Sequence, residues 1–206
     1  MKRKINVVGI ASRFTRDIYQ VAIDQKYEVF LVNNGYDVLD FDENFMELDE
    51  MNLEIPACLG LGSPRSRIEL LRKVESLGSV NWIPLVANDA KVSPSSALSE
   101  GVFLNNGVVI ASKAKIGRHS VVNRLAGIGH HSTVADFVFV APGAQILGDC
   151  FIGEGSYIGA GSVILEGLRV GDNSIVGAGS VVTKDVSPNS VVYGSPARFV
   201  RENLGK

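Results

Sequence analysis

Apolar residues recur every six positions along the second half of the chain. Steps of six from Val92 to Val182 give sixteen positions, and each holds Val, Ile or Leu. Four residues after each of them comes a small or aliphatic residue, and the position just after the aliphatic one is mostly Gly, Ala, Asn or Ser. This period predicts a parallel β-helix in which each hexad is one short strand plus a corner.

The period also predicts how the coils stack. Three hexads close one triangular coil, so residues 18 apart should lie at about the 4.8 Å strand spacing. The aliphatic residue and the residue four positions later should point into the prism. Glycine and asparagine should occupy the corners, where the backbone needs unusual torsion angles. The sixteen hexads give about five coils, whose ends need caps, and the tail after Val186 is the expected C-terminal cap.

Residues 1–91 show another pattern, in which short apolar runs alternate with amphipathic stretches. Helices should begin at Thr15, as a capping residue, and at Ser63-Pro64, whose helix carries an apolar stripe that ends at Leu77. Strands are predicted over residues 5–10, 28–32, 58–61 and 80–86. Strand–helix–strand order implies a small open parallel sheet. The sequence therefore predicts an α/β domain over 1–91 and a β-helix over 92–206.

Composition supports this division. Seventeen of the 22 glycines lie in residues 92–206, and the 7% aromatic content suits a narrow prism. The net charge of -2 gives no electrostatic case for nucleic-acid binding. Two cysteines, no secretory leader and no apolar run long enough to span a membrane predict a cytoplasmic protein. Residues 37–54 hold eight acids and neither Lys nor Arg, which predicts a solvated loop.

The layout resembles a known family. Residues 92–97 (Val-Ser-Pro-Ser-Ser-Ala), the hexads and residues 194–198 (Gly-Ser-Pro-Ala-Arg) resemble the bacterial sugar acetyltransferases. That family includes bacillosamine-pathway and perosamine N-acetyltransferases and sialic acid O-acetyltransferases. The resemblance covers essentially the whole chain. It implies a Rossmann-like domain and a left-handed β-helix, acetyl-CoA as donor, a nucleotide-linked amino-sugar as acceptor, a homotrimer and no metal.

Histidine supplies the candidate base. The chain has three histidines, and His130 matches the family's general base, which takes a proton from the attacking amino group. Asn123 matches the family's substrate-positioning Asn. The acid that follows the family's base is His131 here. Since 131 + 18 = 149, Asp149 should lie one strand spacing from His131, and either Asp149 or Asp136 is expected to orient the base.

The resemblance also implies acyl-CoA contacts, in a groove between neighbouring helices of a trimer. The family's second histidine, which contacts acyl-CoA, is Phe139 here. Backbone contacts fall at Gly148, Ala160 and Ala178. Gly148 should stack over His130, and its N–H is a candidate oxyanion donor.

The nucleotide pocket departs from the family pattern. Gly9 of the glycine-rich loop is kept, but the later glycines are absent. Arg13 either binds phosphate through its side chain or is an ordinary surface residue, and Arg67 stands at the family's Arg. The expected substrate-binding residues are Ser12, Arg13, Phe14, Asn33, Asn34 and Gly62. We therefore expect a remodelled pocket.

Several functions are compatible with these residues. The favoured one is N-acetylation of a nucleotide-activated amino-sugar for surface glycan synthesis. Alternatives are sugar O-acetylation of the sialic-acid type, and a catalytically weakened trimeric scaffold or nucleotide-sugar-binding protein. A zinc site like that of γ-type carbonic anhydrases is disfavoured, because the adjacent His130 and His131 are expected to point in different directions.

Overall fold

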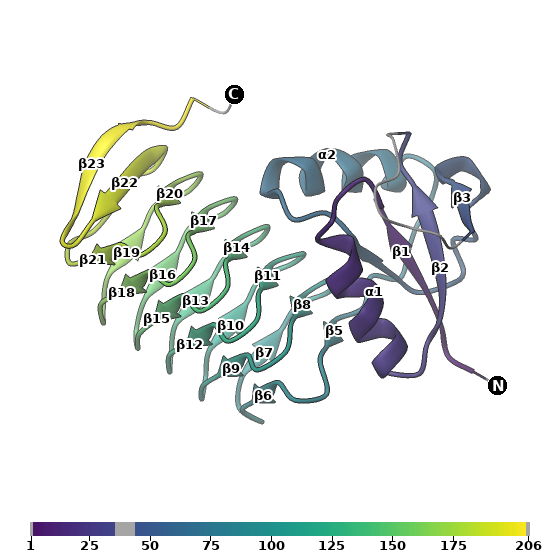
Figure 1. Ribbon diagram of the computed structural model, residues 1–206, viewed down its shortest axis with the longest axis horizontal. Helices are drawn as coiled ribbons and strands as arrows, with labels where there is room; N and C mark the ends of the chain where they lie inside the picture. The colour runs from purple at the N-terminus through teal and green to yellow at the C-terminus, as the bar shows by residue number, and fades with distance from the viewer. Residues whose placement is uncertain (1, 36–43, 205–206) are drawn as a thin grey trace.

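The computed structural model describes residues 2–35 and 44–204 (Figure 1). Two parts lie side by side in it. The N-terminal part is a small parallel sheet with helices, and the second part is a prism of stacked coils that ends at a C-terminal hairpin. The predicted fold class, an α/β domain followed by a left-handed parallel β-helix, is confirmed.

The N-terminal sheet has four parallel strands in the order β3-β2-β1-β4. A helix covers each face, since Val7 packs with residues of α1 and Val8 with residues of α2. This explains why β1 is mostly apolar, because a strand buried on both faces has no solvent side, and its buried Asn6 donates to the carbonyls of Asn52 and Ile55. The elements are β1 (Lys4–Val8), α1 (Thr15–Asp24), β2 (Glu28–Asn33), β3 (Phe45–Glu47), the 3-10 helix η1 (Leu48–Glu50), β4 (Ala57–Leu59) and α2 (Pro64–Glu75).

The two helix starts differ in how well they were predicted. Ser63 caps α2 as expected, with its hydroxyl accepting a bond from the N–H of Ser66. Thr15 does not cap α1. It is the first helical residue, and its hydroxyl donates to the carbonyls of Gly9 and Gly60, at 3.3 and 3.0 Å. The hydroxyl therefore ties together two strand ends.

Three further predictions for this part are wrong. Only Leu85–Val86 of the run 80–86 is a strand, and it pairs with β8 of the β-helix. Leu77 lies beyond α2 and is 46% exposed. The acidic run is not all loop, since β3 and η1 form within it, while residues 37–43 lie outside the described residues. The β-strand Phe45–Glu47 forms because its backbone pairs with β2 at the sheet edge.

Three sheets, parallel apart from the C-terminal hairpin, form the sides of the prism. Strands pair with partners 18 residues away, as Val121 does with Phe139, which confirms the predicted coil length. The first sheet contains β5 (Leu85–Val86), β8 (Phe103–Leu104), β11 (Val121–Val122), β14 (Phe139–Val140), β17 (Tyr157–Ile158), β20 (Ile175–Val176), β22 (Ser190–Gly194) and β23 (Ala197–Glu202). The second contains β6 (Lys91–Val92), β9 (Val109–Ile110), β12 (Gly127–Ile128), β15 (Gln145–Ile146), β18 (Val163–Ile164) and β21 (Val181–Val182). The third contains β7 (Ala97–Leu98), β10 (Lys115–Ile116), β13 (Thr133–Val134), β16 (Phe151–Ile152) and β19 (Arg169–Val170).

The interior follows the hexad. From Leu104 to Val182 every aliphatic position of the period is buried. Serines at the fourth position after it are buried too, and several of them bond between coils, as when Ser120 donates to the carbonyl of Ala135 and accepts from the N–H of Val138. A small hydroxyl both fits the narrow prism and satisfies backbone groups of the next coil.

The corners need two kinds of residue. Left-handed backbone occurs at every sixth residue from Gly101 to Gly179, and seven of these fourteen positions are not glycine. The left-handed conformation falls three residues after the aliphatic position. Gly129 comes only one residue after Ile128 and is not left-handed, so the expectation that it needs unusual torsion angles is wrong. Gly129 is required for another reason, because a Cβ there would collide with the backbone of Leu147 and Gly148 in the next coil.

The N-terminal part lies against the first sheet. Phe103, Val121 and Phe139 share a buried cluster with residues of β1 and α1. The corner that follows the first sheet, here called the Asn123 corner (residues 105, 106, 123, 124, 160 and 178), contacts α1. The corner that precedes it, the Phe137 corner (residues 118, 119, 136, 137 and 155), contacts α2.

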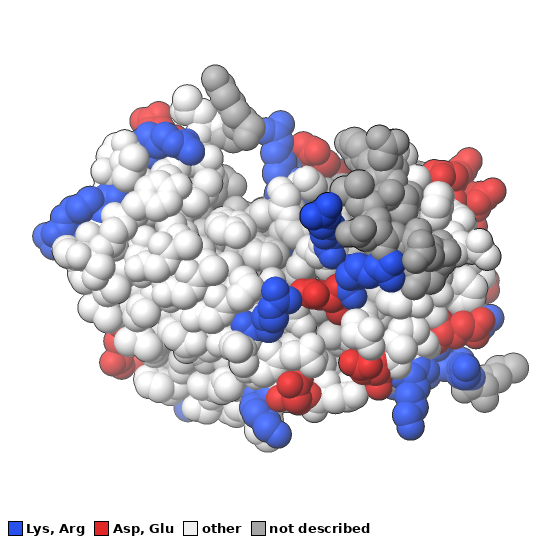
Figure 2. Space-filling model, viewed as in Figure 1, with Lys and Arg blue, Asp and Glu red and all other residues white. Residues whose placement is uncertain are grey.

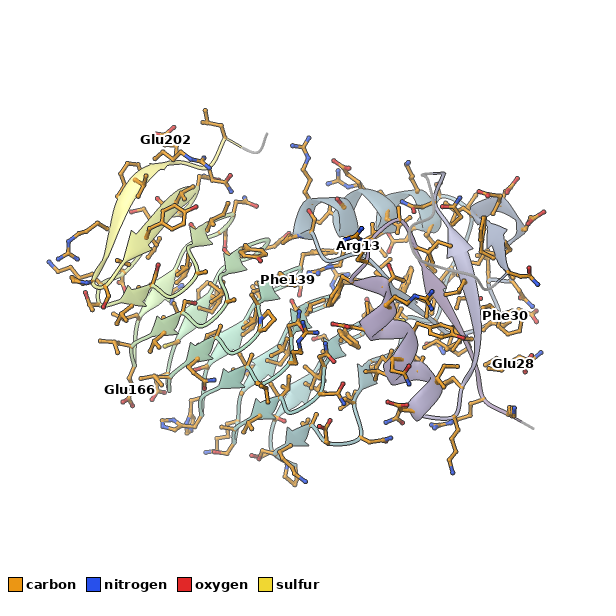
Figure 3. The ribbon with its side chains drawn as sticks, viewed as in Figure 1. Arg13, Glu28, Phe30, Phe139, Glu166 and Glu202 are labelled. Atoms are coloured by element: carbon orange, nitrogen blue, oxygen red, sulfur yellow. The ribbon has the colours of Figure 1, made fainter. Side chains whose placement is uncertain are left out.

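The third corner is the His130 corner (residues 130, 131, 148, 149 and 166), and it lies between the second and third sheets. Figure 3 shows Phe139 directed toward the N-terminal part, whereas Glu166 points outward from the lower edge of the prism. The His130 corner therefore lies away from the interface between the two parts.

Candidate active site

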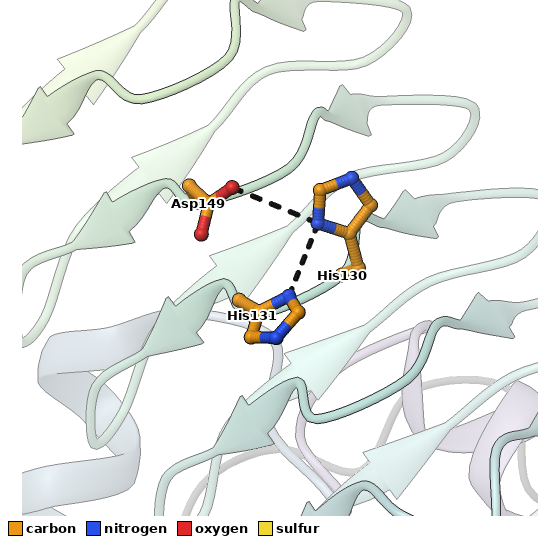
Figure 4. Close-up of side chains that lie close together, drawn as sticks. All are labelled: His130, His131 and Asp149. Carbon is orange, nitrogen blue, oxygen red and sulfur yellow. Dashed lines mark hydrogen bonds and ion pairs between the residues drawn. The ribbon is translucent and has the colours of Figure 1, made fainter.

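Three polar side chains converge at the His130 corner (Figure 4). The Nδ1 atoms of His130 and His131 are 3.2 Å apart, and His130 Nδ1 lies 3.7 Å from Asp149 Oδ2. The His130 and Asp149 side chains are 50% and 56% exposed. The corner thus presents an accessible imidazole with two polar partners on its Nδ1 side.

The backbone explains this convergence. His131 and Asp149 both adopt the left-handed conformation, with φ of 58° and 56°. The expectation that the adjacent histidines point in different directions is wrong, since the left-handed turn at His131 brings the two Nδ1 atoms together. The predicted stacking is also realised, because the N–H of Asp149 donates to the carbonyl of His130 at 2.8 Å.

Gly148 lies against the His130 ring, as the 18-residue spacing predicts. A Cβ at this position would collide with the imidazole. The ring therefore rests on the backbone of the next coil, and only glycine permits that approach. Of the two proposed orienting acids, Asp149 faces His130, whereas Asp136 bonds the backbone N–H and the guanidinium of Arg118.

The catalytic candidate Asn123 and the acyl-CoA candidates Ala160 and Ala178 lie at a different corner from His130. Asn123 is buried at the Asn123 corner, where its side-chain oxygen accepts bonds from Asn105 Nδ2 and from the N–H of Arg124. Ala160 and Ala178 are exposed and stack along this same corner, with the carbonyl of Ala160 bonded to Gly179. Within one chain, a full side of the prism separates this group from His130.

Phe139 packs between the two halves of the chain and is also one of the residues that line a cleft beside α2. It is 7% exposed, stacks on Tyr157 at 5.2 Å and meets Phe14 edge-on at 5.6 Å. Phe14, a predicted substrate residue, also packs against Phe103. Both rings are therefore part of the packing between the two halves of the chain.

The strand ends of the N-terminal sheet form a cavity of about 300 Å³. Ser12, Asn34 and Gly62 line it, together with residues of α2. Asn34 is buried, and its Oδ1 has no hydrogen-bond partner among the described residues. Ligands of open parallel sheets bind at this edge. Three of the residues expected to bind substrate therefore line one cavity.

Two other candidates lie outside this cavity. Asn33 is buried and donates to the Glu47 carboxylate at 3.2 Å. Arg13 is exposed at the loop before α1, below α2 in Figure 3. Neither lines the cavity.

Arg67 has a structural role that the sequence does not reveal. It is 1% exposed, and its guanidinium donates to the carbonyls of Gly62, Phe137 and Val138. Burial lowers its pKa to about 9. The side chain joins α2 to the Phe137 corner, where it is not available to a phosphate group.

A cleft of about 1000 Å³ separates α2 from the C-terminal coils. Tyr157, Ile175 and Asn173 line its β-helix side, and Arg65 and Arg72 line the side of α2. Figure 2 shows it as a notch in the upper surface beside charged side chains. The cleft continues into the smaller cavity, because Gly62, Ser63 and Glu69 line both.

Comparison with known proteins identifies the repeat. Residues 131–165 and 149–184 match the family model for the bacterial transferase hexapeptide (six repeats). The match shows that residues 131–184 are similar to hexapeptide repeats. The chain is 32% identical over 123 residues to the serine acetyltransferase of Bacillus pumilus, covering 55% of the chain and 48% of that enzyme. It thus spans about half the length of the curated relative.

Solved structures match almost the whole chain. The acetyltransferase domain of PglB from Neisseria gonorrhoeae, in complex with acetyl coenzyme A, has 24% identity and a TM-score of 0.89, covering 97% of this chain and 100% of that one. A mutant perosamine N-acetyltransferase from Caulobacter crescentus, with CoA and GDP-perosamine, has 23% identity and a TM-score of 0.87, covering 98% of each chain. These likenesses establish the fold.

No helix in the described parts of the chain is long and apolar enough to cross a membrane.

Proposed function

We propose that the protein is an acetyltransferase that moves the acetyl group of acetyl-CoA to the amino group of a nucleotide-linked amino-sugar. The observation that carries the proposal is the exposed His130 imidazole, which is supported on its Nδ1 side and rests on Gly148. The similar structures that hold acetyl coenzyme A, and CoA with GDP-perosamine, support the choice of substrates. The product would enter surface glycan synthesis in the cytoplasm.

His130 would act through Nε2. With a proton on Nδ1, donated toward His131 or Asp149, the neutral imidazole keeps a lone pair on Nε2. That lone pair takes the proton of the amino group as its nitrogen attacks the thioester carbonyl. The tetrahedral intermediate then expels the CoA thiolate, which receives the proton from Nε2. His131 and Asp149 are positioning residues in this scheme.

Gly148 would serve the same step from the backbone. The absence of a side chain lets the thioester approach beside the imidazole, and a backbone N–H there stabilises the oxyanion of the intermediate. Loss of one such donor costs other enzymes roughly 10²–10³ in kcat.

We further propose a homotrimer, because the groups that the reaction requires lie at different corners of one chain. His130 lies at the corner farthest from the N-terminal cavity, while Asn123, Ala160 and Ala178 follow another corner. If the His130 corner of one chain lies against the Asn123 corner of the next, threefold symmetry assembles three complete sites. Acyl-CoA would then lie in the groove between the two chains.

The acceptor would bind at the N-terminal cavity. The Asn34 oxygen has no partner among the residues that the structure describes, so a hydrogen-bond donor of the ligand would satisfy it. The adjoining cleft offers Arg65 and Arg72 for phosphate oxygens. Both features suit a nucleoside diphosphate with a sugar attached.

Thiol release from acetyl-CoA tests the activity. The wild-type protein and His130→Ala would be assayed with UDP-, GDP- and dTDP-linked amino-sugars, and with a hydroxyl-only sugar as a check for O-acetylation. We expect turnover with one amino-sugar class and a loss of roughly 10²–10⁴-fold in His130→Ala. Binding of acetyl-CoA without turnover on any sugar would instead favour the scaffold function.

Mixed trimers test the shared site. Ala178→Arg should block the proposed CoA groove, and His130→Ala removes the base, so each variant alone should be inactive. Co-refolding the two restores about one quarter of the sites if His130 and Ala178 come from different chains. No recovery would place both groups of a site in one chain.

A further inference from the structure

We infer that the His130 corner is also a binding site for one divalent transition-metal ion such as Zn²⁺. The bound ion prevents His130 from acting as a base. The ligands are His130 Nδ1, His131 Nδ1 and the Asp149 carboxylate. The proposed transfer itself needs no metal, so the site is inhibitory. The switching half of this inference rests on the proposed function, whereas the site itself does not.

The ligand spacing fits an ion. The three ligand atoms all lie within 4.8 Å of one another, and two of their separations are 3.2 and 3.7 Å. Zinc–nitrogen bonds of 2.0–2.1 Å in a tetrahedral site place neighbouring ligand atoms about 3.4 Å apart. Only small side-chain adjustments therefore separate this arrangement from coordination.

The chemistry of the donors selects the class of ion. Two imidazoles with one carboxylate suit zinc, nickel and copper, whereas magnesium and calcium prefer sets composed of oxygen alone. All three residues are exposed, so an ion has an entry path. Three protein ligands leave one tetrahedral position to water.

The backbone holds the ligands in place before any ion binds. The left-handed residues His131 and Asp149 lie in consecutive coils and are fixed by backbone bonds to Ser112 and His130. Gly148 supports the His130 ring. A site built on stacked coils loses little conformational freedom on binding, which favours affinity.

Binding changes which nitrogen of His130 carries the proton. The Nδ1–H bond breaks, its proton leaves to water, and the Nδ1–metal bond forms. A proton from water then joins Nε2, so the imidazole remains neutral with one proton. The Nε2 lone pair that would accept the proton of the amino group is now occupied, and general-base catalysis stops.

The test begins with binding to the full chain after treatment with EDTA. Competition of Zn²⁺ with a chromophoric chelator should give one ion per chain. Asp149→Asn and His131→Asn should each weaken binding at least about tenfold, and asparagine tolerates the left-handed backbone at both positions. The control Glu154→Gln, which changes an exposed carboxylate outside the His130 corner, should bind as the wild type does. Equal affinity in all four proteins would overturn the site.

Two readouts test the switch. ¹⁵N-histidine NMR should show zinc converting one histidine from an Nε2 lone pair to Nε2–H, and zinc should abolish thiol release until EDTA is added. In His131→Asn the inhibiting zinc concentration should rise at least about tenfold. An unchanged tautomer, or full activity of the zinc-loaded protein, would overturn the switch. Zinc binding with the expected variant pattern but no turnover on any sugar would instead count against the proposed function and leave the site standing.

Discussion

His119 and His131 occupy the same position of the hexad, two hexads apart, and both adopt the left-handed conformation. Their surroundings are opposite. His119 is 1% exposed, lies between Trp82 and Phe137, and has no hydrogen bond on either ring nitrogen within the described residues. His131 is exposed and meets His130. The repeat therefore fixes the backbone of a corner, and the neighbours outside the repeat fix its chemistry.

These surroundings give His119 a packing role. Its ring lies on Gly101 of the preceding coil and stacks on Phe137 at 5.4 Å. Burial, reinforced by the nearby guanidinium groups of Arg67 and Arg118, lowers its pKa to about 4. His119 is thus a neutral aromatic residue at physiological pH.

The largest expected effect comes from comparing a substitution of His130 with a substitution of the buried His119. His130→Ala should lower kcat by roughly 10²–10⁴-fold, because His131 and Asp149 lie on the Nδ1 side of His130 and do not replace its Nε2. His119→Phe should leave kcat within about twofold of the wild type, since a phenyl ring keeps the packing. Thiol-release kinetics under saturating substrates measure both. Equal losses in the two variants would show that the contrast between the corners has no catalytic meaning.

Phe139 separates packing from ligand binding. Phe139→Ala should lower the free energy of unfolding by about 3–5 kcal/mol, because it removes a buried ring. Urea denaturation measures the loss, and Phe139→Leu should recover part of it. A variant that keeps its stability but has a raised KM for acetyl-CoA would favour the contact with acyl-CoA that the family resemblance implies.

The pH dependence of stability tests the burial of His119. Its pKa is about 4 in the folded protein and 6.5 as the ordinary value. Between these values the unfolded chain binds more protons, so stability falls as the pH drops from 6.5 toward 4. The expected contribution is about 3 kcal/mol, and His119→Phe should remove it. Parallel pH profiles of unfolding in the two proteins would contradict the burial of a neutral ring.

The smallest effect concerns the left-handed corner itself. Lys113 is exposed with a φ of 59°. Lys113→Gly should stabilise the protein by up to about 1 kcal/mol, because glycine adopts this conformation without steric cost. A lower unfolding midpoint in Lys113→Gly would mean that the Lys113 side chain stabilises the protein by more than its left-handed backbone destabilises it.

The sequence predicts the second half of the chain far better than the first. Sixteen hexads repeat one physical demand, so the coil length, the buried positions and the contact of Gly148 with His130 follow from counting. Thr15 and the run 80–86 are not repeated, and their conformation depends on contacts that no local pattern encodes. Arg67 was missed as a structural residue for this reason, since its acceptors include the carbonyls of Phe137 and Val138, some 70 residues away in sequence.

The site shows the same division. Spacing correctly placed Asp149 beside the two histidines. It did not reveal that the left-handed turn directs His131 toward His130, because the period places a residue on a corner without giving the direction of its side chain. The period does separate Asn123 from His130, because they follow consecutive strands and so lie on different corners of one coil.

The 18-residue coil makes surface position a matter of arithmetic. In the inner coils, a strand residue has a neighbour in space 18 positions earlier and another 18 positions later, each one strand spacing away. Two functional groups are therefore set a chosen number of coils apart by choosing their residue numbers, with no change of backbone. Moving a functional residue by 18 positions in such a sequence therefore moves its side chain by one coil along the same corner, without changing the corner on which it lies.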